Sequence, residues 1–291
     1  MRFNKLDTRH FFDRLRLYIF HNPTRDNEIS IMNYILRVEG VSKDFSPALS
    51  LRQLCALDFK YKKSIRALQD ISFALKRNKI MCILGLNGAG KTTLLKIISQ
   101  LVLADKGKVF VNGSYREEEI KSSVGLLLDE ERSFYWRLTG RQNLEFFAAL
   151  YGLQNAQIKA RIEELLALFG LDYADRRFDT YSTGMKRNFS LLRTLLHEPE
   201  LMLLDEPTKS LDYLSTLKVK RFIKDELLGR QRKSIIFTTH QIREAADLAE
   251  LLLILHKGKI RGYGTLEELR EKINMPQATL EDIFMRLTSE S

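Results

Sequence analysis

Short apolar runs recur along the chain and alternate with stretches in which apolar residues follow helical spacing. Each run has the length of one strand, and the helical spacing is clearest just after residue 90 and across 143–170. The strand-like runs are 34–38, 67–75, Ile80–Leu84, 201–204, 234–238 and 251–255. Strands that alternate with helices favour a mostly parallel sheet covered on both faces, so the pattern predicts an α/β fold.

The first part of the chain differs in composition from the rest. Residues 1–31 are rich in arginine and lysine, and their apolar residues fit one face of a helix. Three interpretations of this N-terminal extension stay open: a helix on a membrane surface, a poorly ordered appendage, or sequence upstream of a true start at Met32. The main domain is predicted over 32–288, with an insertion over 46–66.

Composition narrows the class of protein without naming a function. The 291 residues are 44% apolar and 29% charged, which is typical of a globular protein. No apolar stretch reaches the roughly 20 residues that span a bilayer, and the start does not read as a secretory signal, so we expect a cytoplasmic location. The net charge of +10 fits nucleic acid or an anionic membrane surface equally well. Cys55 and Cys82 predict neither a disulfide framework nor a zinc site.

A glycine-rich motif lies between a predicted strand and a predicted helix. It fits the phosphate-loop pattern G-x-x-x-x-G-K-[ST] in full. Its backbone N–H groups and the helix N-terminus are expected to bind the phosphates of ATP. Lys91 would reach the β- and γ-phosphates, and the Thr92 hydroxyl would ligate Mg²⁺. The predicted phosphate-binding residues are Gly85, Leu86, Asn87, Gly88, Ala89, Gly90, Lys91, Thr92 and Thr93.

An acidic pair follows the apolar run 201–204. Asp205 and Glu206 would emerge at the carboxyl edge of a parallel sheet, where ligands bind in α/β folds. We expect Asp205 to hold Mg²⁺, directly or through water, and Glu206 to polarise the water that attacks the γ-phosphate. Taken alone an Asp-Glu pair is a weak signal, but after a phosphate loop it predicts a hydrolytic site.

A third motif, Tyr-Ser-Thr-Gly-Met over 181–185, precedes the acidic pair. It resembles the Leu-Ser-Gly-Gly-Gln signature of the ATP-binding-cassette (ABC) family in place and form, and the resemblance covers about 35–288. It implies a P-loop NTPase fold with a mostly parallel core sheet, an antiparallel β subdomain and an α-helical signature subdomain at about 130–190. The Tyr-Ser-x-Gly-Met form is associated with exporters of polysaccharides, lipids or drugs.

In that family, the signature contacts ATP held by the opposite subunit of a head-to-tail dimer. The resemblance therefore assigns Ser182, Thr183 and Gly184 to the opposite subunit's ATP, although Thr183 and Met185 depart from the family pattern. A serine at a helix N-terminus supplies a capping hydroxyl. The side chain of Thr183 must point away from the phosphate for this contact to survive.

Further roles follow from the same resemblance. Asp212 would reach across the dimer interface as the D-loop, and His240 would sense the γ-phosphate. Phe45 would stack on adenine, with a core phenylalanine as the alternative. The family's usual glutamine before the helical subdomain is missing, and Asp129 stands in its place. Asp129 has a carboxylate suited to Mg²⁺, but the coupling to a membrane partner stays open.

The resemblance implies an ATP-hydrolysing subunit that powers a separate integral membrane permease. Its partners would be that permease, which would work as an exporter, and a second ATPase subunit, with which it would form a homodimer. The ATPase subunit would lie at the cytoplasmic face of the membrane. No specific nucleic acid is expected. An ABC ATPase acting on ribosomes or nucleic acid is the alternative, and the net charge of +10 offers it some support. A catalytically silent module fits poorly with intact Lys91, Asp205, Glu206 and His240.

Overall fold

The computed structural model describes residues 33–46, 64–128 and 134–289. The predicted extension 1–31 and most of the predicted insertion lie outside these ranges. The nine described strands are β1 (Tyr34–Phe45), β2 (Ile65–Lys76), β3 (Ile80–Leu84), β4 (Lys106–Val111), β5 (Val124–Leu127), β6 (Leu201–Asp205), β7 (Ser234–Thr239), β8 (Leu251–His256) and β9 (Lys259–Gly264). All the predicted strand-like runs are strands.

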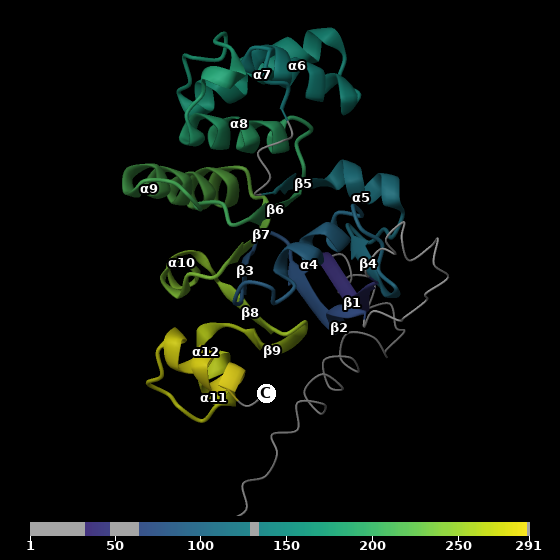
Figure 1. The fold of residues 1–291 in the computed structure, drawn as a ribbon, viewed down its shortest axis with the longest axis vertical. Helices are drawn as coiled ribbons and strands as arrows, with labels where there is room; N and C mark the ends of the chain where they lie inside the picture. The colour runs from purple at the N-terminus through teal and green to yellow at the C-terminus, as the bar shows by residue number, and fades with distance from the viewer. Residues whose placement is uncertain (1–32, 47–63, 129–133, 290–291) are drawn as a thin grey trace, which may run out of the picture.

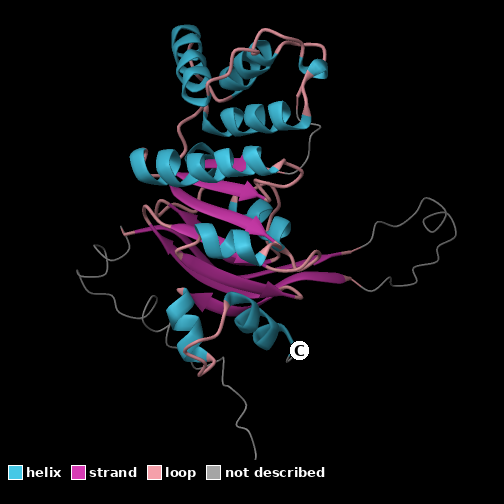
Figure 2. Cartoon of the chain, turned by 90° about the vertical axis from the view of Figure 1, so that its left-hand side faces the viewer, coloured by secondary structure: helices cyan, strands magenta, loops and turns pink. Residues whose placement is uncertain are grey.

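Helices lie around the sheets and beyond one end of them (Figure 1). Figure 2 shows helices on both sides of the strands, with a separate group of helices at one end of the molecule. The described helices are α4 (Lys91–Ile98), α5 (Glu117–Ser123), α6 (Gly140–Leu150), α7 (Asn155–Phe169), η2 (Phe178–Thr180), α8 (Thr183–Leu195), α9 (Tyr213–Arg221), η3 (Phe222–Arg230), α10 (Ile242–Leu248), α11 (Leu266–Lys272) and α12 (Leu280–Ser289).

Two sheets form the centre of the molecule. The smaller is antiparallel in the order β2-β1-β4, and the larger has the order β5-β6-β7-β3-β8-β9. In the larger sheet every neighbouring pair is parallel except β8 and β9, which pair antiparallel. The predicted α/β class, with a mostly parallel sheet and an antiparallel sheet, is confirmed.

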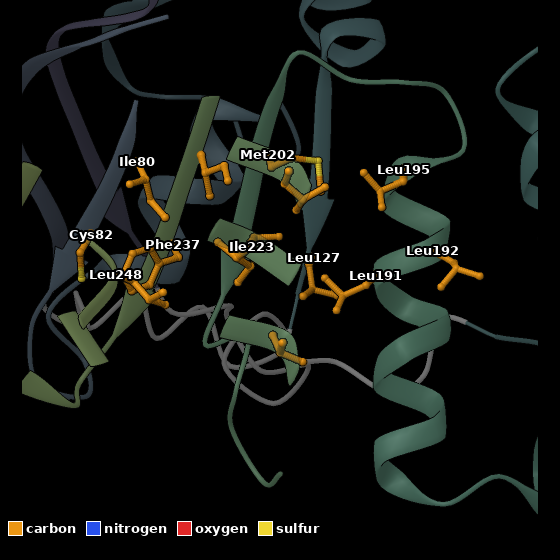
Figure 3. Close-up of a cluster of buried hydrophobic side chains, with 14 of the residues drawn as sticks. Ile80, Cys82, Leu127, Leu191, Leu192, Leu195, Met202, Ile223, Phe237 and Leu248 are labelled. Atoms are coloured by element: carbon orange, nitrogen blue, oxygen red, sulfur yellow. The ribbon is translucent and has the colours of Figure 1, made fainter. Parts of the chain in front are cut away.

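Burial on both faces explains the continuous apolar runs of the larger sheet. Along β3, Ile80 and Cys82 belong to one buried cluster, whereas Met81 and Ile83 belong to the other. Successive side chains of a strand point to opposite faces, so a strand covered twice must be apolar at every position. Figure 3 shows the first cluster, where Cys82, Met202 and Phe237 come from the sheet.

The helical group consists of α6, α7 and α8, which pack on one another. The predicted helical region 143–170 is two helices, and the chain breaks between them because Gly152 adopts a left-handed conformation with φ 82°. Helix α8 also packs against β5, and Leu191 of α8 joins Leu127 of β5 in the buried cluster of Figure 3. This contact fixes the signature segment relative to the sheet.

Strands β4, β5 and β9 were not among the predicted runs. For β9, Lys-Ile-Arg-Gly-Tyr-Gly over 259–264 lacks a strand-like apolar pattern. Its backbone pairs with β8 at the end of the sheet, with Leu253 opposite Tyr263. The Tyr263 hydroxyl donates a hydrogen bond to the carbonyl of Ala74 in β2, and burial raises the pKa of Tyr263 to about 12. Pairing across the sheet, rather than local pattern, makes this segment a strand.

Replacing Phe237 with alanine should lower the free energy of unfolding by about 3–5 kcal/mol, because the substitution leaves a cavity in a fully buried site of the central sheet. Urea unfolding of the nucleotide-free protein measures the loss. Leu101→Ala is the control, since Leu101 is 58% exposed and a surface change costs within about 0.5 kcal/mol. Equal losses for the two variants would contradict the core described above.

Candidate functional site

The predicted phosphate loop joins β3 to α4 at the carboxyl edge of the larger sheet. Gly90 precedes the first turn of α4 with φ 106°, a left-handed conformation that glycine adopts without a steric penalty. A Cβ atom at Gly90 would lie 2.6 Å from the carbonyl oxygen of Ala67, and one at Gly85 would lie 2.4 Å from that of Leu255. Close packing of the backbone therefore requires both glycines.

Lys91 is almost fully buried, with 6% of its surface exposed. Its Nζ donates hydrogen bonds to the carbonyl oxygens of Gly85 at 2.8 Å and Leu86 at 3.2 Å, so the side chain folds back over the loop. Burial lowers the pKa of Lys91, while the carboxylates of Glu206 and Asp205 act in the opposite direction. The loop thus holds the ammonium group of Lys91 close to the acidic pair.

Asp205 ends β6 and receives two hydroxyl groups. Thr92 Oγ1 donates to Asp205 Oδ2 at 2.8 Å, and Thr238 Oγ1 donates to Asp205 Oδ1 at 2.5 Å. The hydroxyl of Thr92 and the carboxylate of Asp205 are hard oxygen donors, which suit Mg²⁺ when phosphate oxygens and water complete its coordination. Among the described residues, no group of three or more His, Cys, Asp and Glu side chains forms a metal cage by itself. The donor set fits a metal that arrives with a phosphate ligand.

Glu206 has an unusual backbone, with φ 45° in the left-handed region. Such a conformation costs a non-glycine residue about 1–3 kcal/mol and persists only where the surroundings impose it. The Glu206 N–H donates to Thr238 Oγ1 at 3.1 Å. Its Oε1 lies 3.0 Å from His240 Nδ1 and 3.9 Å from Lys91 Nζ. The carboxylate is held between an imidazole and an ammonium group.

The phosphate loop and the acidic pair line a cavity of about 510 Å³. Phe45, Ile65 and Lys209 also line it. Phe45 is 42% exposed and therefore is not the core phenylalanine of the alternative interpretation. An exposed aromatic ring on the wall that also contains the phosphate loop fits a planar base, although this role stays a prediction.

The signature residues lie away from this cavity. Ser182 caps α8 and accepts a hydrogen bond from the Met185 N–H at 3.3 Å. Ser182 and Thr183 are exposed, and a Cβ at Gly184 would meet no atom within 4 Å. No signature residue is among those that line the cavity. The chain therefore does not bring its own signature to its own phosphate loop.

Two other candidates differ in how they are held. Asp212 caps α9 and accepts hydrogen bonds from Ser215 through its N–H at 2.9 Å and its hydroxyl at 2.6 Å. These bonds lower the pKa of the exposed Asp212 carboxyl. Asp129 lies outside the described residues, and its neighbour Leu128 lines the cavity.

Sequence reasoning missed two polar contacts behind the acidic pair. The buried Glu244 of α10 accepts a hydrogen bond from Thr208 Oγ1 at 2.5 Å. The buried guanidinium of Arg187 donates to carbonyl oxygens at the end of β6. A signal was available for Arg187, since it lies one turn before Leu191 on the buried stripe of α8, where an apolar residue is normal.

Comparison with known proteins identifies the family to which this chain belongs. The model of the family "ABC transporter" matches residues 68–209. The ABC transporter ATP-binding protein NatA of Bacillus subtilis (strain 168) is 37% identical over 222 residues, which cover 75% of this chain and 89% of NatA. This chain belongs to the ABC transporter family. It is an ATP-binding and ATP-hydrolysing subunit.

Two further relatives agree with this assignment. The daunorubicin resistance ATP-binding protein DrrA3 of Streptomyces coeruleorubidus is 35% identical over 214 residues, covering 70% of this ABC protein and 65% of DrrA3. The solved structure of an ATP-binding subunit of an ABC transporter has a TM-score of 0.71 at 25% identity and covers 87% of this chain and 99% of its own. Within the described ranges, every helix of this ABC protein is too short or too polar to cross a bilayer.

Gly90→Ala should weaken ATP binding by about tenfold or more, because a left-handed backbone costs an L residue roughly 1–2 kcal/mol and 1.4 kcal/mol is tenfold in affinity. Titration with a fluorescent ATP analogue measures the change. Gly229→Ala is the control, because Gly229 has an ordinary φ and its added Cβ would come no nearer than 3.2 Å to the Lys224 carbonyl. Unchanged binding by Gly90→Ala would show that the loop tolerates another conformation.

Proposed function

We propose that this ABC ATPase hydrolyses MgATP between two copies of the chain and thereby powers export through a separate integral membrane permease. The observation that carries the proposal is the convergence of Lys91, Thr92, Asp205, Glu206 and His240 at one edge of the larger sheet. Phosphate-binding, metal-binding and water-activating groups lie there within contact distance of one another.

The phosphate loop binds the nucleotide in this proposal. The N–H groups of residues 85–93 and the N-terminus of α4 receive the phosphate oxygens. Lys91 leaves the carbonyls of Gly85 and Leu86 to contact the β- and γ-phosphates. The base rests against Phe45, which lines the same cavity.

Thr92 and Asp205 would hold Mg²⁺, and that ion would supply positive charge to offset the phosphate charge in phosphoryl transfer. Glu206 accepts a hydrogen bond from the attacking water and orients it toward the γ-phosphate. His240 Nδ1 lies 3.0 Å from Glu206 Oε1, and we assign to His240 the hydrogen bond to the γ-phosphate in the ATP-bound state. We also propose a role for Asp129 beside this metal.

The second copy is proposed because the signature and the phosphate loop of one chain are separate. Ser182 and Thr183 lie exposed, and Gly184 partly exposed, at the N-terminus of α8, where the helix dipole favours an anion. They contact the γ-phosphate held by the partner, and Asp212 crosses the same interface. The dimer then closes on ATP and opens after hydrolysis, and this movement is passed to the permease.

A permease is proposed to dock on the helical group. Exposed aromatic side chains lie on α6 and just before it, among them Tyr135 and Trp136, each 51% exposed, and Phe146, which is 37% exposed. The rings of Tyr135 and Phe146 lie 4.8 Å apart, and Lys186 Nζ lies 4.9 Å over the ring of Trp136. Exposed aromatic clusters of this kind mark protein-binding surfaces. The drug-resistance relative supports export as the direction, and the permease would place this subunit at the cytoplasmic face of the membrane.

Glu206→Gln should bind ATP normally but hydrolyse it about 10²–10⁴-fold more slowly, because the amide cannot accept a proton from the attacking water. Phosphate release measures turnover, and size-exclusion chromatography with ATP should show a trapped dimer. Glu250→Gln is the control, since Glu250 pairs with Lys79 at 2.8 Å, at the amino end of the strands. Normal turnover by Glu206→Gln would remove Glu206 from its assigned role.

Affinity purification from detergent-extracted native membranes tests the transport assignment. We expect an integral membrane protein to copurify and to stimulate ATP hydrolysis. Replacing Trp136 with alanine should reduce this copurification while leaving basal hydrolysis unchanged. Recovery with ribosomes or DNA, and without a membrane protein, would favour the non-transport alternative.

A further inference from the structure

Arg187 is a buried cation on α8, with 9% of its surface exposed. Its guanidinium donates hydrogen bonds to carbonyl oxygens of three consecutive residues, Asp205, Glu206 and Pro207, at 3.0, 2.5 and 3.2 Å. It also donates to the carbonyl of Leu128 at 3.4 Å. One side chain thus holds the chain just beyond the ends of both β6 and β5.

The peptide groups of Glu206 are fixed from two sides. Thr238 of β7 accepts a hydrogen bond from its N–H, and Arg187 of α8 donates to its carbonyl oxygen. The backbone between these contacts has φ 45°, a conformation that non-glycine residues keep only when their surroundings impose it. The direction of the Glu206 side chain therefore depends on both contacts.

Arg187 also lies on the helix that the signature begins. Ser182 caps α8, and Arg187 is in the second turn of that helix. At a rise of about 1.5 Å per residue, the five residues from Ser182 to Arg187 span roughly 7–8 Å of the helix. A displacement of the signature end would therefore move the guanidinium that holds the Glu206 carbonyl.

We propose that Arg187 is a positioning residue that sets the orientation of Glu206 and links it to the position of the signature helix. The inference rests on the proposed role of Glu206 in hydrolysis. In a dimer, the partner's ATP contacts Ser182, and Arg187 carries the resulting position of α8 to the Glu206 of its own chain. ATP bound in one site thereby helps to align the attacking water in the other.

The chemistry of the contacts explains why arginine suits this place. A guanidinium presents five N–H donors in a rigid plane, and several of them reach different carbonyls at once. A lysine keeps the charge but concentrates its donors at one point on a flexible stem. Methionine keeps much of the length and removes every donor.

The test compares Arg187→Met and Arg187→Lys with Arg161→Met in the full-length protein. Arg161 of α7 is a matched control because its side chain is 11% exposed and donates at 2.8 Å to the carbonyl of Leu195, the last residue of α8, away from the acidic pair. The measurements are kcat and half-saturating ATP from phosphate release, the affinity for a fluorescent ATP analogue, and Tm.

We expect Arg187→Met to lower kcat about 10²-fold, since a misplacement of about 1 Å in a catalytic group has that effect. Half-saturating ATP and analogue affinity should stay within about twofold of wild type, because the phosphate loop is untouched. Arg187→Lys should fall between Arg187→Met and wild type. Arg161→Met should lower Tm but keep the wild-type kcat.

Equal kcat for Arg187→Met and Arg161→Met would overturn the inference, and so would a parallel loss of kcat and ATP affinity. If Arg187→Met does not fold, Arg187→Lys decides, with a lower kcat at unchanged affinity in favour and an unchanged kcat against. Glu206→Gln separates the two proposals. If it is inactive while both Arg187 variants are normal, only the positioning role fails, and if it is fully active, both fail.

Discussion

Two hydroxyl groups from different elements donate hydrogen bonds to the carboxylate of Asp205, and the rest of the site is arranged around this contact. Thr238 reaches it from the neighbouring strand β7, in register with Asp205, and Thr92 reaches it from α4. The carboxyl ends of parallel strands meet at one edge of a sheet, so residues far apart in sequence converge there. The phosphate loop, the acidic pair and His240 all owe their proximity to this edge.

Precision at this edge rests on a rigid support. Every side chain of β3, β6 and β7 is buried, because helices or the smaller sheet cover both faces of the larger one. Close-packed interiors resist small displacements. They can therefore impose a left-handed backbone on Glu206, which an isolated chain would avoid. The stability of the core is what maintains the conformation of the loop.

The exposed surfaces complement this rigid centre. Ser182 and Asp212 each cap a helix with an acceptor oxygen, and both lie exposed outside the nucleotide cavity. Their caps fix the start of α8 and α9 without closing either surface. In the proposed dimer these surfaces meet the partner's nucleotide, and α8 also has a buried side that contacts the acidic pair through Arg187. Helix α8 would thus contact the partner's nucleotide through Ser182 and act on the nucleotide site of its own chain through Arg187.

The sequence by itself determined the phosphate loop, the acidic pair, the signature cap and six of the nine described strands. Gly90 and Lys91 bracket a turn whose form depends on neighbouring residues, and strands buried on both faces need an apolar run that is visible locally. Only the tertiary structure decided that 259–264 is a strand, that Phe45 is exposed beside the phosphate loop, and that Arg187 holds the Glu206 carbonyl. These features depend on contacts between residues that are distant in sequence. Only the packing of helices on sheets brings such side chains together, so a local sequence pattern does not reveal them.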